Sequence, residues 1–209
     1  MKQDVATNLQ IEKQLDIPKA FEMDELILYR KWLNEAATKN LSRVFTNKDQ
    51  KHAAIAFDVF FRNTRKSILM IVDSFKGGPS NDPGYVDSLA ACLKQDKIKA
   101  RILILYQPNY DSAGFKLFLN AMKSGKDVQI NQASENSKDI IRKDMETSIL
   151  NAGELQNIAV FDDCMYRFEY MPSNYRALLS FNDCELAYQY TSTINRAFNA
   201  GIPIPLPTT

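Results

Sequence analysis

The side chains that could do nucleophilic or acid–base chemistry are few in this chain. Histidine occurs once, as His52, and cysteine three times, as Cys92, Cys164 and Cys184. A Ser-His-Asp or Cys-His mechanism would have to use His52 as its base. The residues after it are alanines, and the segment has the pattern of a helix. We therefore expect His52 to have a structural role.

The cysteines form no metal-binding motif. No two of them make a CxxC pair, and one histidine adds a single further ligand, so the spacing of a zinc site is missing. An odd number of cysteines in apolar surroundings is typical of reduced thiols in the cytosol. We expect reduced cysteines, a cytoplasmic location, no metal and no cofactor.

Carboxylates near the ends of expected strands are the other candidates, because sites in α/β proteins form where strands end. Asp73, Asp162, Asp163 and Glu169 have this position. A phosphodiester-cleaving site built on them, without histidine, would need a divalent metal. Asp162-Asp163 is also the composition of a hairpin turn, which is the interpretation that we favour for this pair.

Composition places the chain among folded α/β proteins. Its 209 residues are 45% apolar and 11% aromatic, enough for one core with a short extension. The net charge is +1, from 26 basic and 25 acidic residues, so no global field favours nucleic acid. No apolar run reaches the length of a membrane span, and the first residues do not have the pattern of a signal peptide.

The hydrophobic pattern predicts helices that alternate with buried strands. An amphipathic helix is expected from an N-cap at Asp24 to Lys39. Two continuous apolar runs, residues 67–73 and 100–106, predict strands covered on both faces, and the strand–helix–strand order implies parallel pairing. The polar segment 134–150 has some helical period and is either a helix or a surface excursion. The other expected helices cover 47–65, 85–95, 113–123 and 183–200, and the other expected strands cover 127–131, 157–161, 165–170 and 176–181.

Three parts are expected along the chain. Residues 1–46 would be an N-terminal arm and the amphipathic helix, 47–200 an α/β domain, and 201–209 a proline-rich tail, extended or polyproline-like. The first twenty residues would be a short helix or a flexible arm. The glycine- and proline-rich segment 77–84 predicts a loop, for which we favour a simple connector over a lid.

The order of elements over residues 48–199, and the C-terminal segment above all, resembles a phospholipase D-like domain. The family has a strand, an acidic turn, a second strand, a small-residue–Ser–x–Asn segment and a helix. The matching pieces are Asn157-Ile158-Ala159-Val160-Phe161-Asp162-Asp163, Met165-Tyr166-Arg167, Leu179-Ser180-Phe181-Asn182-Asp183, Glu185 and Phe198. The resemblance implies an α/β fold, an α-β-α sandwich with a mixed sheet, here with an N-terminal helical extension.

The chain departs from the family where the resemblance would place a reaction. Active members carry His-x-Lys on the first of these strands, but Asn157 stands at the histidine place and Ala159 at the lysine place. Asp163 lies near the acidic place, with Cys164 at the strict spacing. An amide is no substitute for a histidine nucleophile, and a methyl group cannot neutralise phosphoryl charge. We therefore expect a catalytically degenerate relative, a pseudoenzyme without catalytic residues.

The degenerate pocket could still bind a ligand. Asn157, Ser180 and Asn182 could hydrogen-bond an anion, with Arg167 nearby, and Ala159 would line the same pocket. The segment that begins at Ser180 is also typical of a strand end and a helix cap, and we favour that interpretation.

Two surface features are candidate binding surfaces for nucleic acid or for a protein partner. Arg62, Arg65, Lys66 and Lys76 form a basic cluster that could attract a phosphate backbone, although cations also suit a helix end. Tyr29 and its aromatic neighbour on the first helix either pack on the domain or dock a partner.

We expect a non-catalytic binding or assembly module for a protein partner or nucleic acid. A homodimer is a further expectation, because the family's single-motif chains pair. The alternative is a phosphodiester-cleaving enzyme with a relocated, non-histidine site.

Overall fold

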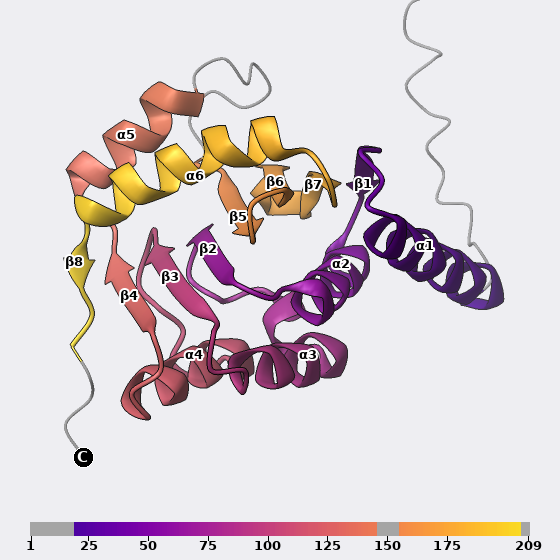
Figure 1. Cartoon of the computed structure of the whole chain (residues 1–209), viewed down its shortest axis with the longest axis horizontal. Coiled ribbons are helices and arrows are strands. Elements are labelled where there is room, and N and C mark those ends of the chain that lie inside the picture. Colours follow the sequence, from indigo (N-terminus) through magenta and orange to yellow (C-terminus); the bar gives the residue numbers. More distant parts are fainter. Residues whose placement is uncertain (1–18, 146–154, 206–209) are drawn as a thin grey trace, which may run out of the picture.

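The computed structural model describes residues 19–145 and 155–205. They form three layers, with one mixed β-sheet between two layers of helices (Figure 1). The strand order is β1-β7-β6-β5-β2-β3-β4-β8. The predicted α-β-α sandwich with a mixed sheet is confirmed. The strands are β1 (Phe45–Asn47), β2 (Ser67–Val72), β3 (Lys99–Ile104), β4 (Val128–Gln132), β5 (Asn157–Phe161), β6 (Met165–Met171), β7 (Arg176–Ser180) and β8 (Ile202–Pro203).

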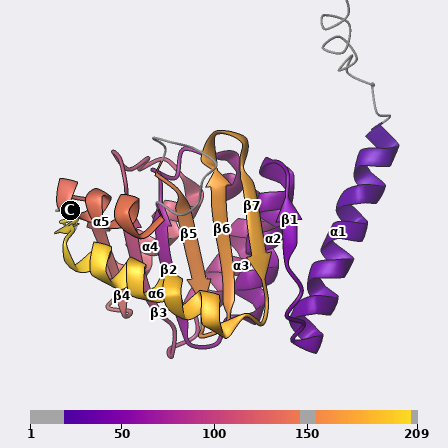
Figure 2. The ribbon, with the colours of Figure 1, turned by 90° about the horizontal axis from the view of Figure 1, so that it is seen from above.

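Helices cover both faces of the sheet. Figure 1 shows α2, α3 and α4 on one face and α5 and α6 on the other, whereas α1 stands beyond β1 and packs on α2 (Figure 2). No helix in the described ranges is both long enough and apolar enough to cross a membrane. The helices are α1 (Lys19–Lys39), α2 (Gln50–Asn63), α3 (Pro83–Leu93) and α4 (Ala113–Lys123), then α5 (Glu135–Met145) and α6 (Cys184–Asn199), with the short 3-10 helices η1 (Gly78–Asn81) and η2 (Pro172–Asn174).

The pairing in the middle of the sheet defines its two ends. β2, β3 and β4 are parallel neighbours, connected through α3 and α4, so all three begin at one end of the sheet. We call this the crossover end; it holds the turns at residues 62–67, 94–99 and 123–128. β5 runs antiparallel to β2, so β5 begins beside the point where β2 finishes. We call this opposite end the cavity end.

Alternate residues of each central strand enter opposite layers. On β5, Ala159 and Phe161 face the layer of α2, whereas Ile158 and Val160 face α6. The ring of Phe161 stacks on Phe60 of α2 with centroids 4.6 Å apart. Burying a large apolar side chain contributes about 1.5–3 kcal/mol, so these two layers hold the sheet between them.

The chain ends and the segments beside them differ in detail from the sequence-based expectation. α1 begins before Asp24, so Asp24 lies inside the helix and is not its cap. The segment that follows the first expected helix contains β1, whose three residues pair with β7. The extended tail is confirmed at Ile202–Pro203, which pairs with β4 as β8. The helical alternative for the polar segment is confirmed at Glu135–Met145, which form α5. The expectations for residues 1–18, 146–150 and 206–209 lie outside the described residues.

Two of the cysteines are bonded to each other. Cys164, in the turn after β5, and Cys184, the first residue of α6, form a disulfide. The two come together because the backbone N–H of Asp183 donates to the carbonyl of Cys164 at 2.8 Å. The prediction of reduced thiols is therefore wrong for this pair. Cys92 is free and buried, and burial raises the pKa of its thiol to about 12.

Candidate functional site

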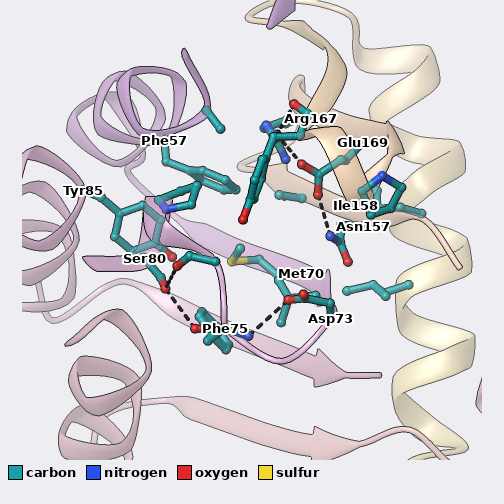
Figure 3. A pocket seen from close by; sticks show the side chains of 18 residues that line it. Phe57, Met70, Asp73, Phe75, Ser80, Tyr85, Asn157, Ile158, Arg167 and Glu169 are labelled. Carbon is teal, nitrogen blue, oxygen red and sulfur yellow. Dashed lines mark hydrogen bonds and ion pairs between the residues drawn. The ribbon is translucent and has the colours of Figure 1, made fainter. Parts of the chain in front are cut away.

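A cavity of about 100 Å³ lies at the cavity end, where β2 finishes, between the sheet and α2 (Figure 3). It is smaller than the roughly 150 Å³ that admits benzene in an engineered protein core, so it suits a ligand of a few heavy atoms. Residues from β2, β5, β6, α2 and α3 and from the loops after β2 and β6 line it. The polar and aromatic residues of the lining are Asp73, Ser80, Asn157, Arg167, Glu169, Phe57, Phe75, Tyr85 and Tyr175.

A buried ion pair on β6 forms one wall. Arg167 and Glu169 are only 3% and 4% exposed, and Nη2 of Arg167 donates to Oε1 of Glu169 at 2.8 Å. Nε of Arg167 donates to Oδ1 of Asn47 at 3.1 Å, and the guanidinium lies 5.0 Å from the ring centroid of Phe57. A buried charge is stable only when ion pairs and hydrogen bonds of this kind replace its contacts with water. The network therefore holds Arg167 in one position.

This ion pair lies directly across from the two β5 positions where the resemblance would place His-x-Lys. In the β5–β6 register, Asn157 is opposite Glu169 and Ala159 is opposite Arg167. Nδ2 of Asn157 donates to Oε2 of Glu169 at 2.5 Å, while Oδ1 of Asn157 is buried with no partner. The positive charge beside Ala159 thus comes from the neighbouring strand, and Glu169 already neutralises it.

Two loops close the other sides of the cavity. After β2, Oδ1 of Asp73 accepts hydrogen bonds from the backbone N–H groups of Ser74 and Phe75, at 2.5 and 3.2 Å. After β6, Tyr175 has a left-handed backbone with φ of 56°, which is uncommon for a residue other than glycine. The carbonyl of Tyr175 accepts from Nη2 of Arg167 at 3.4 Å, so the buried network holds this turn too.

Glycine at position 77 makes room for the ring of Tyr175. A Cβ on Gly77 would lie 3.1 Å from the Tyr175 hydroxyl, closer than ordinary packing allows. Across the cavity, burial raises the pKa of Tyr85, an effect that the charge of Arg167 opposes. The Tyr85 phenol therefore stays protonated at neutral pH and can both donate and accept.

The lining carries more negative than positive charge. Its charged side chains are the carboxylates of Asp73 and Glu169 and the guanidinium of Arg167, which together amount to −1. Within the described residues, no group of three or more His, Cys, Asp or Glu side chains is arranged to hold a metal ion. The cavity as it stands offers acceptors and a negative charge.

The structure brings together three of the five expected site residues. Asn157, Ala159 and Arg167 line the cavity, but Ser180 and Asn182 do not. β7 runs back along β6, so the strand that ends at Ser180 returns to the crossover end.

The segment around Ser180 is engaged in packing and capping. Nδ2 of Asn182 donates to the carbonyl of Asn40 at 2.9 Å, and Oδ1 of Asp183 caps α6 by accepting from the backbone N–H of Leu186 at 3.1 Å. The ring of Phe181 stacks on Phe60, with centroids 4.6 Å apart, and fills the space beside it. These contacts fit the cap interpretation.

Other candidate residues have structural roles. His52 lies on α2 and is buried, with Nδ1 2.8 Å from Oδ1 of Asp49. Oδ1 of Asp162 accepts from the backbone N–H groups of Lys66 and Ser67, and Asp163 pairs with Lys66 at 2.7 Å. Asp162-Asp163 is thus the turn that its composition predicts.

Sequence reasoning missed Asn47, Tyr85 and Tyr175 as residues of this site. Nothing local marks Asn47 or Tyr175, because the pairing of β1 with β7 brings them together from far apart in the chain. A signal did exist for the ion pair: Arg167 and Glu169 lie two residues apart in a strand, on either side of Phe168, and so share one face.

The crossover end carries a second feature, a group of basic side chains. Lys99, Lys126 and Lys66 form ion pairs with Asp127, Asp96 and Asp163. Lys94, Lys97 and Lys123 are exposed and make no ion pair within the described residues. Lys76, which we expected in this cluster, follows β2 at the opposite end. The basic residues of the crossover end are Arg62, Arg65, Lys66, Lys94, Lys97, Lys99, Lys123 and Lys126.

No family model matches the chain. No curated protein matches its sequence either. Solved structures do resemble it. Nuc from Salmonella typhimurium, a phospholipase D family member, matches with a TM-score of 0.53 and 16% identity over 78% of this chain and 97% of Nuc. NucT from Helicobacter pylori matches with a TM-score of 0.51 and 12% identity over 78% of this chain and 99% of NucT.

A third similar structure is that of TrmBL2, an archaeal chromatin protein with a novel mode of DNA binding. Its TM-score is 0.51 and its identity 12%, over 89% of this chain and 65% of TrmBL2. At such identities the likeness establishes the fold alone. The fold of this chain is phospholipase D-like.

Proposed function

We propose that this chain is a non-catalytic phospholipase D-like domain that binds the phosphate backbone of nucleic acid at its crossover end. The observation that carries the proposal is the division of charge along the sheet. Unpaired cations gather at the crossover end, while the lining of the cavity sums to −1. A phosphate would meet an excess of carboxylates at the place where relatives react.

The side chains at the cavity support the proposed absence of catalysis. An attack on phosphorus needs a nucleophile and a cation that neutralises the transferring group. The Asn157 amide lacks nucleophilicity and is held by Glu169, and the positive charge of Arg167 is engaged by the same carboxylate. Neither residue supplies what the reaction requires.

Binding at the crossover end is supported by the exposure of its lysines and by the fold it shares with a DNA-binding protein. Lys94, Lys97 and Lys123 lie in successive helix-to-strand turns, so one stretch of backbone phosphates could contact all three. Each contact releases counterions, which gives affinity without sequence preference. TrmBL2 is a chromatin protein that binds DNA, and this chain has a similar fold.

A fluorescence anisotropy titration with a labelled duplex at several salt concentrations tests the proposal. We expect affinity to fall steeply with salt, and the triple variant Lys94→Gln, Lys97→Gln, Lys123→Gln to flatten the log–log slope by about 3. The matched triple Lys31→Gln, Lys116→Gln, Lys143→Gln removes the same charge from exposed positions on α1, α4 and α5. It should keep most of the slope. Equal effects of the two triples would contradict a specific surface.

The same duplex, incubated with the protein and a divalent metal, tests the absence of catalysis. We expect no cleavage above that of the buffer. Cleavage that disappears in the Asn157→Ala variant would overturn the proposed absence of catalysis. The proposed binding of nucleic acid would then still be tested by the anisotropy titration.

A second candidate function, protein binding, is favoured by α1. Tyr29 and Leu33 of α1 are buried against the domain, but Ile27, Leu28 and Trp32 are 61%, 42% and 50% exposed. Exposed apolar patches on one helix are typical of docking surfaces. A second copy of the chain is the partner that purified protein can test. Light scattering should then give a dimer mass that Trp32→Glu reduces to that of a monomer.

A further inference from the structure

We propose that the cavity binds a small organic cation, an ammonium or guanidinium group, in place of the phosphate that the fold would suggest. The proposal concerns the cavity end and is independent of nucleic-acid binding at the crossover end. It rests on three properties of the cavity: its charge, its unused hydrogen-bonding groups and its size.

The charge of the cavity favours a cation. Arg167 and Glu169 are paired at 2.8 Å and neutralise each other. Asp73 is then the remaining charge of the lining, and the structure gives it no ion pair with any described residue. A cation would complete the charge balance, whereas a phosphate would bring further negative charge beside Asp73 and Glu169.

The unused hydrogen-bonding groups also favour a ligand that donates. Oδ1 of Asn157 is buried without a partner, although buried polar atoms almost always have one. Its orientation is fixed, because Nδ2 of the same amide donates to Glu169. Figure 3 shows the Asn157 oxygen turned away from Glu169, on the side of the cavity where Asp73 lies. An N–H donor placed there would satisfy the Asn157 oxygen, and its positive charge would lie on the side of Asp73.

The volume of the cavity and its aromatic lining restrict the ligand to a small cation. The volume of about 100 Å³ accommodates a few heavy atoms. Tyr85, Tyr175 and Phe75 provide aromatic surface, which attracts cations, and the two phenols add hydroxyls. The chemical class is therefore a primary ammonium or a guanidinium, either as a free metabolite or at the end of a longer ligand.

Asp73→Asn is the decisive variant, since Asn keeps an oxygen for the turn's backbone N–H groups and removes only the charge. Asp96→Asn is its matched control, because Asp96 is 95% exposed in its side chain and lies at the crossover end. The full-length protein, labelled with ¹⁵N, would be titrated with ethylammonium chloride and separately with sodium phosphate, at constant ionic strength. The signals to follow are the side-chain amide of Asn157 and Nε–H of Arg167.

We expect a saturable shift of the Asn157 signal with ethylammonium and none with phosphate. Asp73→Asn should weaken the binding of ethylammonium roughly tenfold or more, as loss of a charged hydrogen-bond acceptor implies, and Asp96→Asn should leave it unchanged. Saturable shifts with phosphate, no response to ethylammonium, or equal binding by the Asp73→Asn variant would each overturn the proposal. Unchanged backbone signals in both variants would establish that they remain folded.

Discussion

The two ends of the sheet handle charge in opposite ways. At the cavity end, Arg167 and Glu169 are buried, and Arg167 contacts Asn47, Glu169, the Tyr175 carbonyl and the Phe57 ring. At the crossover end, Lys94, Lys97 and Lys123 project into solvent. β2 runs from the crossover end to the cavity end and so belongs to both. The Arg167–Glu169 pair is therefore part of the fold, whereas the charge of these lysines is available to a partner.

At the cavity end, the two charged residues of β6 lie across from uncharged residues of β5. Ala159 leaves space on β5, and the Arg167 side chain from the adjacent strand lies opposite it. Asn157 donates to Glu169 from the same strand. The charged residues of the cavity end are thus held in a structural network.

The largest effect is expected from Glu169→Gln, which leaves the Arg167 charge buried without its anion. We expect a loss of about 3–5 kcal/mol in the free energy of unfolding, measured by urea denaturation. The double variant Arg167→Met, Glu169→Leu should recover much of this, because it removes both charges together. Glu35→Gln, on the exposed face of α1, is the control and should have no measurable effect. A single variant as stable as the control would refute a structural role for the pair.

A smaller effect is expected from Asp162→Ala at the crossover end. The Asp162 carboxylate accepts from the backbone N–H groups of Arg65, Lys66 and Ser67, and it fixes the turn into β2. Its removal should cost about 1–2 kcal/mol, as for the loss of a helix cap. Asp163→Ala provides the comparison, because that carboxylate is exposed and contacts only the Lys66 side chain. Similar losses in both would show that the turn does not depend on capping.

The lysine triple at the crossover end should barely alter stability. Lys94, Lys97 and Lys123 have no ion pairs among the described residues, so their replacement by Gln removes no fixed contact. We expect each to change the free energy of unfolding by no more than about 0.5 kcal/mol, while affinity for DNA falls. A marked drop in the thermal midpoint would mean that these lysines also support the fold.

The smallest effect concerns pH and Asp49, the N-cap of α2. Burial alone would raise the pKa of Asp49, but hydrogen bonds from the backbone and ring of His52 outweigh it and lower the pKa. The stabilisation by a depressed carboxyl is present above its unfolded pKa of about 3.9 and is lost as the pH falls through the folded value. The stability difference between wild type and Asp49→Asn should therefore shrink below about pH 4. A constant difference in urea unfolding across that range would contradict the assignment.

The regular elements could be predicted because their patterns are local. The apolar run at residues 67–73 and the alternation at 165–170 each contain enough period to identify a strand, and β2 and β6 follow them closely. β1 could not be predicted in this way. Its three residues, Phe45–Asn47, have too little pattern, and they form a strand only because β7 offers a partner.

The candidate site was predictable only in part, because sequence spacing does not say where a strand turns back. Ser180 follows Asn157 at a spacing that suits a shared pocket, but the extra reversal at η2 sends it to the other end of the sheet. The ring of Tyr175 reaches the cavity because the backbone of this residue is left-handed. No glycine next to it in the sequence indicates such a turn. These features depend on long-range pairing, which local propensity does not encode.

The place of β2 in the sheet has a consequence for how the chain comes to be folded. β2 ends at Val72, but its neighbour β5 begins only at Asn157, so the 84 residues 73–156 must be synthesised between them. At ribosomal rates this takes roughly 5 to 20 seconds. Throughout that interval one side of a central apolar strand has unpaired N–H and C=O groups that can pair with other nascent chains. The yield of this protein in a cell should therefore depend on chaperone capacity during translation more than on the stability of the finished fold.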